Sequence, residues 1–330
     1  MASARPKRPR KRTARRKPKA PPKLISVVIP AYNEEPNLRF IYEYLRVVFD
    51  NGNDDAEIVF VDDGSTDNSR EILTQLHKHD SRVKAIFLSR NFGQSAALTA
   101  GIEAAKGDAI IVMDADGQDP PEVVPDLIAK WKEGYEVVGG KRTSRRGEPV
   151  IKRALAFVWY RVMRLLVGWD MPVDTGEFRI LDRKVADVFC ACPQRHRLVR
   201  TLTSWPGFRQ TTVDYDHAPR HAGKSKYTTG SSFRLALTSI TGFSLAPLRI
   251  AFAVGIAVIF CALFACAWIL ISGARDTVNL IALAVAGLWL LGGIQCVLIG
   301  IIGEYVGRNY IETQRRPLYV VRDTVGINRK

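Results

Sequence analysis

The chain has 330 residues, which is enough to bury the core of one large domain or two small ones. Its five cysteines lack the spacing of a disulfide framework or a zinc site, which excludes both and fits reduced, cytoplasmic chemistry. The formal net charge of +15 is concentrated at the ends and in the middle of the chain. The first apolar segment is short and follows a basic, proline-rich leader, so no amino-terminal signal peptide is predicted.

Residues 1–23 are mainly Lys, Arg, Pro and Ala and contain no aromatic side chain. Such a segment cannot bury a core, and we predict that it is a disordered basic tail. Attraction to anionic lipid headgroups, worth about 1 kcal/mol for each basic residue near the surface, is favoured over nucleic-acid binding. A purely solvated tail is an equal alternative.

Residues 24–229 have the pattern of a soluble α/β domain. Short apolar runs at 24–29, 57–61, 83–88 and 110–113 predict strands. Apolar or small residues at helical spacing follow each of the first three runs and predict helices between them. This alternation predicts right-handed βαβ units and a mostly parallel sheet.

Polar residues follow the predicted strands, and the carboxyl ends of parallel strands form the ligand-binding edge of such a sheet. Asp114 and Asp116 come directly after the fourth strand. Two carboxylates on a short turn suit Mg²⁺ or Mn²⁺, with diphosphate and water completing the coordination. A strand-to-turn transition with solvated aspartates is the alternative, but Gly117 and the prolines at 120–121 fix a tight loop and favour the metal site.

The loops after the first two strands supply candidate nucleotide-binding side chains, which are Pro30, Tyr32, Glu34, Asp62 and Asp63. The carboxylates can accept hydrogen bonds from a nucleobase or from ribose hydroxyls, and the two rings can flank a base. An ordinary turn with Asp67 capping the next helix is the alternative for residues 63–67. Neither a G-x-G-x-x-G nor a P-loop pattern is present, which disfavours dinucleotide and P-loop sites.

A basic segment between residues 141 and 164 is interleaved with aromatic and aliphatic side chains, including Trp159 and Tyr160. A lipid phosphate requires such donors, with Arg favoured for bidentate contact, and the aromatic residues suit a helix at a headgroup boundary. A nucleic-acid groove would also be basic. An amphipathic helix packed on the sheet with its charges in water is the other alternative.

Residues 250–272 and 278–302 predict two membrane-spanning helices. At about 1.5 Å per residue, each apolar run can cross a hydrocarbon core of about 30 Å. A buried core hairpin is the disfavoured alternative. We also predict an amphipathic juxtamembrane segment at 230–249 and a cytoplasmic C-terminal segment at 304–330.

Basic residues flank the two predicted spans, and they are Arg249, Arg308, Arg315 and Arg316. The turn between the spans carries one Arg and one Asp. The positive-inside rule therefore predicts a multi-pass protein of the inner (cytoplasmic) membrane, with the catalytic domain and both termini in the cytoplasm. Glycines in the second span would allow close helix packing between subunits.

Several motifs together resemble family 2 glycosyltransferases with the GT-A fold. They are SVVIPAYNEE at 26–35, VDDGSTD at 61–67, LSRNFGQSAALTAGI at 88–102 and DADGQDPPE at 114–122. From about residue 25 to 322 the chain resembles most closely the polyprenyl-phosphate glycosyltransferases, a group with bactoprenol glucosyltransferases and dolichol-phosphate mannose synthases. GGIQCVLIGIIGEYVGRNY at 292–310 and RRPLYVV at 315–321 carry this closer resemblance.

The resemblance implies a Rossmann-like GT-A domain followed by a transmembrane hairpin, and it implies roles for particular residues. Asp114, Asp116 and Gln118 match the metal-diphosphate motif, and Pro30, Tyr32, Glu34, Asp63 and Asp114 match nucleotide-binding positions. The basic loops at 141–148 and 220–227 match acceptor-side loops, in which we expect phosphate contacts from Arg142, Arg145, Arg220, Lys224 and Lys226.

Glu177 falls where bactoprenol glucosyltransferases commonly carry Asp and mannose synthases usually carry Gly. A carboxylate at this position favours the glucosyltransferase branch. Glu177 is expected to orient donor or acceptor, or to act as a base, and with Asp116 it forms the predicted catalytic pair.

The sequence therefore predicts a membrane-anchored inverting enzyme that moves glucose from UDP-glucose onto undecaprenyl phosphate at the cytoplasmic leaflet, with Mg²⁺ or Mn²⁺. The resemblance also implies a homo-oligomer, a tetramer. A GDP-mannose or UDP-amino-arabinose donor is the alternative within enzymes, whereas a processive synthase is disfavoured because no QxxRW motif is present. A nucleic-acid-binding membrane protein would explain the tail but not the acidic strand ends, so no nucleic-acid partner is expected.

Overall fold

The computed structural model describes residues 23–143, 175–195, 197–216, 246–272 and 277–327. Several sequence predictions concern residues outside these ranges. They are the basic tail at 1–22, the basic aromatic segment at 144–164, nearly all of the juxtamembrane segment at 230–249, and the four predicted phosphate-binding residues Arg145, Arg220, Lys224 and Lys226.

The described residues form an eight-stranded sheet with the order β7-β5-β6-β4-β1-β2-β3-β8. The strands are β1 (Leu24–Ala31), β2 (Asp55–Asp62), β3 (Val83–Leu88), β4 (Ala109–Val112), β5 (Val137–Arg142), β6 (Thr175–Asp182), β7 (Gln210–Tyr215) and β8 (Val321–Val325). The pairings β1–β2, β1–β4, β2–β3 and β5–β7 are parallel. β6 is antiparallel to β4 and β5, and β8 is antiparallel to β3. The predicted mostly parallel α/β sheet is confirmed.

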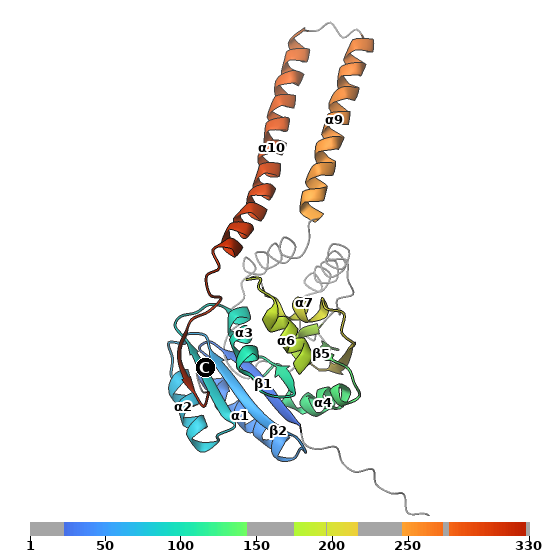
Figure 1. The fold of residues 1–330 in the computed structure, drawn as a ribbon. Coiled ribbons are helices and arrows are strands. Elements are labelled where there is room, and N and C mark those ends of the chain that lie inside the picture. Colours follow the sequence, from blue (N-terminus) through green and yellow to red (C-terminus); the bar gives the residue numbers. More distant parts are fainter. Residues whose placement is uncertain (1–22, 144–174, 196, 217–245, 273–276, 328–330) are drawn as a thin grey trace, which may run out of the picture.

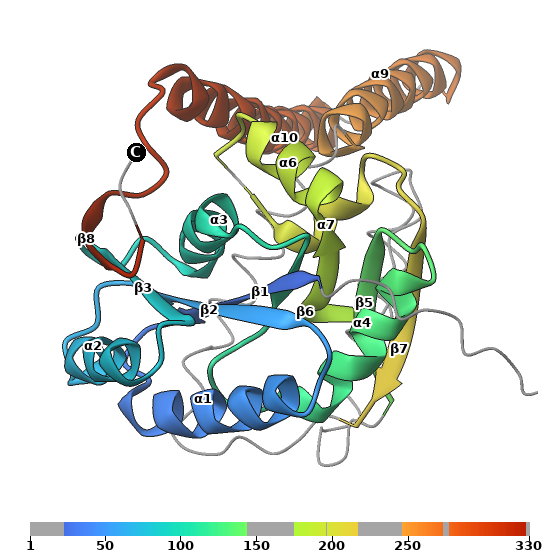
Figure 2. The same cartoon turned by 60° about the horizontal axis from the view of Figure 1, so that its bottom comes forward.

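Helices cover both faces of this sheet, which gives three layers (Figure 2). One face carries α1 (Glu35–Asp50), α2 (Ser69–His79), η1 (Pro121–Val123) and α4 (Val124–Lys132). The other face carries α3 (Gln94–Ala104), α6 (Arg183–Ala191) and α7 (Val199–Ser204). A separate apolar core lies on each face, because the strand residues alternate between the two sides.

The local sequence explains how these helices pack. α1 buries Leu38, Ile41 and Leu45, which recur at helical spacing and face the first core. On the other face α3 is rich in small residues, and Gly101 lies so close to β1 that an added Cβ would be 2.3 Å from Cγ1 of Val28. A helix of small residues can therefore approach the sheet closely.

The predicted strands are confirmed, with small shifts at their ends. β1 continues two residues beyond the predicted end, through Ala31, and β2 begins at Asp55 rather than at residue 57. The predicted helix cap, Asp67, lies one residue before the actual N-cap, Asn68. Its carboxylate nevertheless accepts the backbone N–H of Ser69, the first residue of α2, at 3.1 Å.

Two long helices extend away from the sheet domain, α9 (Ala246–Ser272) and α10 (Thr277–Thr313) (Figure 1). The segments Leu248–Ala265 and Gly287–Thr313 have mean hydropathies of 2.5 and 1.7, and almost none of either is buried against protein. By length and composition both can cross a membrane. α10 continues past the predicted span end at residue 302, where Glu304 and Arg308 form an ion pair one turn apart.

The chain then returns to the sheet, a feature that sequence reasoning did not predict. After α10, β8 pairs antiparallel with the edge strand β3, and Ser89 donates its backbone N–H to the carbonyl of Val320 at 2.9 Å. Val325 packs on one core, whereas Val321 and Tyr319 pack on the other. The C-terminal segment is thus part of the sheet domain, and it covers the β3 edge, which would otherwise expose unpaired backbone groups.

We expect truncation after Thr313 to destabilise the sheet domain. The deletion removes β8 and the partly buried side chains Tyr319, Val321 and Val325, so the apparent melting temperature of the detergent-solubilised protein should fall by about 5 °C or more. The uncovered edge of β3 should also increase aggregation. Truncation after Ile327 is the matched control, since it keeps β8. Equal melting temperatures for the two truncations would contradict a stabilising role for this strand.

Candidate active site

The loops that follow β1 and β2 are bonded to each other. Asn33, whose φ of 51° is left-handed, donates its backbone N–H to Oγ of Ser65 at 2.9 Å. Its side-chain Oδ1 accepts the backbone N–H of Thr66 at 2.8 Å. The predicted nucleotide-binding residues Pro30, Tyr32, Glu34, Asp62 and Asp63 are carried by these two adjoining strand ends. The structure thus brings them to one place.

Asp63 connects a third strand end to this pair. Its two carboxylate oxygens accept the backbone N–H groups of Phe92 and Gly93, at 2.7 and 2.9 Å, in the loop after β3. The side chain is buried, and burial raises the pKa of Asp63 although the two N–H groups act in the opposite direction. The carboxylate therefore holds the loops together, a structural role that sequence reasoning did not assign.

The turn after β4 carries the predicted metal ligands. Oδ1 of Asp114 accepts the side-chain amide of Gln94 at 2.7 Å, and Oδ1 of Asp116 accepts the backbone N–H of Gln118 at 3.1 Å. Gly117 has a φ of 75°, which a side chain would strain. β1 lies between β2 and β4, so this turn is at the point where the strand order reverses. Ligands bind at such points in open α/β sheets.

Asp119 and Tyr215 complete the turn, and sequence reasoning assigned neither a role. Oδ2 of Asp119 accepts the backbone N–H of Asp114 at 3.3 Å, and its Oδ1 accepts the hydroxyl of Tyr215 at 2.8 Å. A guanidinium nitrogen of Arg142 lies 4.0 Å from the same Oδ1. Asp119 is within the recognised motif, but Tyr215 is brought here only because β7 pairs with β5.

Glu177 reaches the same region from β6, and its negative charge acts on Asp114. Its Oε2 is buried and accepts no hydrogen bond from the part of the chain that the structure describes. Two residues further along β6, the buried Arg179 donates to the carbonyl of Gly176 at 2.6 Å and to Oγ1 of Thr203 at 3.2 Å. Burial lowers the pKa of Arg179 to about 10, whereas the charge of Glu177 opposes this shift.

The local electrostatics favour binding of a cation. Burial, followed by the charges of Asp119, Asp116 and Glu177, raises the pKa of Asp114 to about 8, against the opposing charge of Arg142. Burial also raises the pKa of Asp119. These crowded carboxylates and the unsatisfied Oε2 of Glu177 fit a divalent ion.

No preformed cluster of three or more His, Cys, Asp or Glu metal ligands is present among the residues with a described placement. A Mg²⁺ site commonly uses only one or two protein carboxylates, together with substrate phosphates and water. Arg142 is the one predicted phosphate-binding residue within the described ranges, and its side chain is 33% exposed beside this turn.

The mostly parallel sheet with an acidic turn at its switch point agrees with the GT-A fold that the sequence motifs led us to expect. The family model "Glycosyl transferase family 2" matches residues 26–189. An uncharacterized glycosyltransferase of Bacillus subtilis (strain 168), YkcC, is 42% identical over 92% of this chain and 95% of its own length. The chain therefore belongs to glycosyltransferase family 2 and is an enzyme of that family.

Other relatives carry more specific names. The prophage bactoprenol glucosyl transferase homolog of Escherichia coli (strain K12) is 37% identical, over 90% of this chain and 98% of the relative. The bactoprenol glucosyl transferase of Shigella phage SfV is 35% identical over 91% and 98%. Among solved structures, glucosyl-3-phosphoglycerate synthase from Mycobacterium tuberculosis, in complex with Mn²⁺, UDP-glucose and phosphoglyceric acid, aligns with a TM-score of 0.46. Its sequence is 18% identical over 67% of this chain and 79% of that chain.

The raised pKa of Asp114 predicts how stability depends on pH when no cation is bound. The folded protein binds this proton more tightly than the unfolded chain, in which Asp has a pKa of about 4. This proton therefore contributes to the free energy of unfolding. The contribution is complete below about pH 4 and is lost as the pH rises toward the folded pKa of about 8. We expect the melting temperature of EDTA-treated full-length protein to fall from about pH 5 to about pH 8, and added Mn²⁺ to reduce the fall.

Asp114→Asn should flatten this pH profile, because it removes the titrating carboxyl. Asp126→Asn is the matched control, since Asp126 is an exposed aspartate in the first turn of α4. An unchanged profile in Asp114→Asn would contradict the assignment of the pH dependence to Asp114.

Proposed function

We propose that this enzyme transfers glucose from UDP-glucose to the phosphate of undecaprenyl phosphate, or of a similar polyprenyl phosphate, with inversion at the anomeric carbon. One observation carries the proposal: the similarity to bactoprenol glucosyl transferases extends over about nine-tenths of the chain and includes the hairpin helices. An acceptor that resides in the membrane gives a physical reason for the hairpin.

The return of the chain to the sheet supports a lipid acceptor. α10 ends at Thr313, seven residues before Val320, whose carbonyl accepts the N–H of Ser89 directly after β3. Seven residues can span at most roughly 25 Å. The end of a membrane-type helix is therefore within that distance of the carboxyl end of β3, and the site lies at the carboxyl ends of the neighbouring strands. A lipid phosphate at the membrane surface would have a short path to the donor sugar.

We assign the nucleotide to the strand ends of β1 and β2. Pro30 and Tyr32 would flank the base, and Glu34, Asp62 and Asp63 would accept hydrogen bonds from base or ribose. Asp114 and Asp116, with Gln118, would hold Mg²⁺ or Mn²⁺ beside the diphosphate. Such an ion supplies neutralisation of the charge that develops on the leaving group.

The acceptor side of the reaction falls to Arg142 and to Arg145, Arg220, Lys224 and Lys226. A phosphate oxygen of the acceptor attacks the anomeric carbon as its bond to the diphosphate oxygen breaks, and UDP leaves. That phosphate is already largely ionised near neutral pH, so positioning and electrostatic stabilisation contribute more than a general base. Glu177 orients the acceptor or donor, and a role as base is secondary.

The proposal includes a cytoplasmic catalytic domain. Arg249 in the first turn of α9, and Arg308, Arg315 and Arg316 at the other end of the pair, favour this orientation by the positive-inside rule. Both termini would then be cytoplasmic, in a two-span protein of the inner membrane. Glycines along α10 would allow subunits to pack as a homo-oligomer.

The function is tested by incubating purified protein and undecaprenyl phosphate with a panel of UDP-glucose, GDP-mannose and UDP-amino-arabinose. The lipid product is identified by mass spectrometry. We expect a glucosyl phospholipid from UDP-glucose and a divalent cation, and no product after chelation. Preferential transfer of another sugar would overturn the donor assignment, and the absence of any glycosylated lipid would overturn the function.

Asp116→Asn should lower the turnover number by at least about 100-fold, because it removes a charged ligand from the proposed cation site. Turnover is measured with UDP-glucose at saturating Mn²⁺. Asp126→Asn on α4 is again the control and should retain wild-type turnover. Full metal-dependent activity of Asp116→Asn would contradict the assignment of the metal site.

A further inference from the structure

A chain of hydrogen bonds joins the proposed acceptor side of the site to the acidic turn. Nε of Arg142 donates to the hydroxyl oxygen of Tyr215 at 3.2 Å. The Tyr215 hydroxyl donates in turn to Oδ1 of Asp119 at 2.8 Å. Oδ2 of Asp119 accepts the backbone N–H of Asp114 at 3.3 Å. One phenolic hydroxyl can accept and donate at the same time, so it can connect the two groups.

The surrounding packing fixes the Tyr215 ring. The side chain is 4% exposed, and the ring of Phe178 meets it edge to face with centroids 5.5 Å apart. On β5, an added Cβ at Gly140 would lie 2.8 Å from Cε1 of Tyr215 and 2.9 Å from Cδ1 of Phe178. The ring thus passes over a strand position where a larger residue would collide with it, and the hydroxyl has one place to lie.

Arg142 needs such a partner. Its guanidinium lies 4.0 Å from Oδ1 of Asp119, and a long side chain without a second contact could turn and pair directly with this carboxylate. A guanidinium paired in that way would be withdrawn from an incoming phosphate. The Tyr215 hydroxyl lies between Arg142 and Asp119, and the two residues Arg142 and Tyr215 are register partners at the ends of β5 and β7.

We propose that Tyr215 is a positioning residue that holds the Arg142 guanidinium toward the acceptor phosphate and ties it, through Asp119, to the turn that carries Asp114 and Asp116. This inference rests on the proposed function, in which Arg142 binds that phosphate. Preorganised donors are effective because they do not reorganise when the ligand binds or reacts. The hydroxyl therefore acts on acceptor binding through Arg142, without touching the substrate itself.

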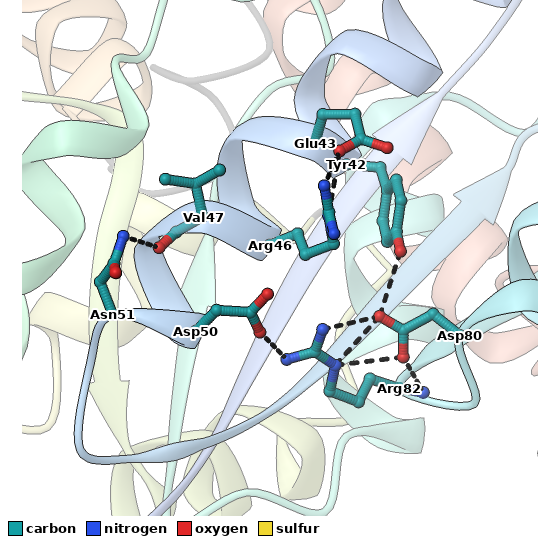
Figure 3. A network of polar contacts seen from close by, with 8 residues as sticks. All are labelled: Tyr42, Glu43, Arg46, Val47, Asp50, Asn51, Asp80 and Arg82. Carbon is teal, nitrogen blue, oxygen red and sulfur yellow. Dashed lines mark hydrogen bonds and ion pairs between the residues drawn. The ribbon is translucent and has the colours of Figure 1, made fainter.

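The test compares Tyr215→Phe with Tyr42→Phe. Tyr42 is also a buried tyrosine whose hydroxyl donates to an arginine-paired carboxylate, Oδ2 of Asp80, at 3.2 Å (Figure 3). Asp80 lies three residues before Val83, the first residue of β3, so this network is at the amino end of that strand, opposite the site. Both substitutions remove one hydroxyl from a buried network and keep the ring.

We expect Tyr215→Phe to lower kcat/KM for undecaprenyl phosphate about tenfold, the effect of losing one hydrogen bond to a charged group, and to leave the KM for UDP-glucose within about twofold. Binding of a short-chain polyprenyl phosphate to the metal-free protein, measured by calorimetry, should weaken by a similar factor. Tyr42→Phe should leave kcat/KM and lipid-phosphate binding unchanged, even if it lowers the melting temperature as much as Tyr215→Phe does. In an Arg142→Lys background, the additional substitution Tyr215→Phe should lower kcat/KM for undecaprenyl phosphate by less than a further factor of about three.

The outcomes separate this inference from the proposed function. If the wild type is active and Tyr215→Phe matches Tyr42→Phe in both kinetics and lipid-phosphate binding, the positioning role is overturned and the function stands. Equal loss toward donor and acceptor, or full additivity with Arg142→Lys, also overturns it. A wild type that binds the lipid phosphate in a Tyr215-dependent way but transfers no sugar would overturn the function and retain the positioning role.

Discussion

The concentration of negative charge at one edge of the sheet is the constraint on which the rest of the site depends. Asp114 lies near the carboxylates of Asp116, Asp119 and Glu177, and burial, together with these neighbouring negative charges, raises the pKa of Asp114; burial also raises the pKa of Asp119. Arg142 relieves only part of this unfavourable electrostatic energy. The protein alone does not neutralise these carboxylates. A bound cation, together with the phosphates of a substrate, would do so.

The fold holds these repelling groups together by anchoring the backbone rather than by pairing every charge. Backbone N–H groups bind Asp63 and Asp116 in their loops. The buried Arg179 holds β6 through the carbonyls of Gly176 and Glu177. The carboxylates stay in position because the cost of their proximity is offset by hydrogen bonds and packing elsewhere in the domain.

Features that depend on residues adjacent in the sequence could be predicted from the sequence. Short continuous apolar runs predicted β1 to β4, and the polar residues at the strand ends predicted the edge at which Asp114 and Asp116 lie. The roles of Tyr215 and Arg179 were not predicted, because no local sequence pattern marks these residues. Only the pairing of β7 with β5 and of β6 with β4 brings them to the site. β8 was not predicted for the same reason, since the partner of its five residues, β3, is distant in sequence.

The return of the C-terminal segment changes what the two long helices mean for catalysis. A hairpin connected to the domain only through residue 246 would tether the domain to a membrane but leave its orientation open. Here a second connection runs from the end of α10 to β8 (Figure 1), and Arg195 donates its backbone N–H to Glu312 at 2.8 Å. Two connections restrict rotation far more than one, because each removes orientations that the other leaves accessible. Tyr319 adds a contact to Glu103 of α3 at 2.6 Å. The sheet edge is thereby held at a defined distance from the helix ends, which is the condition under which a phosphate confined to a membrane surface could meet a nucleotide bound at that edge.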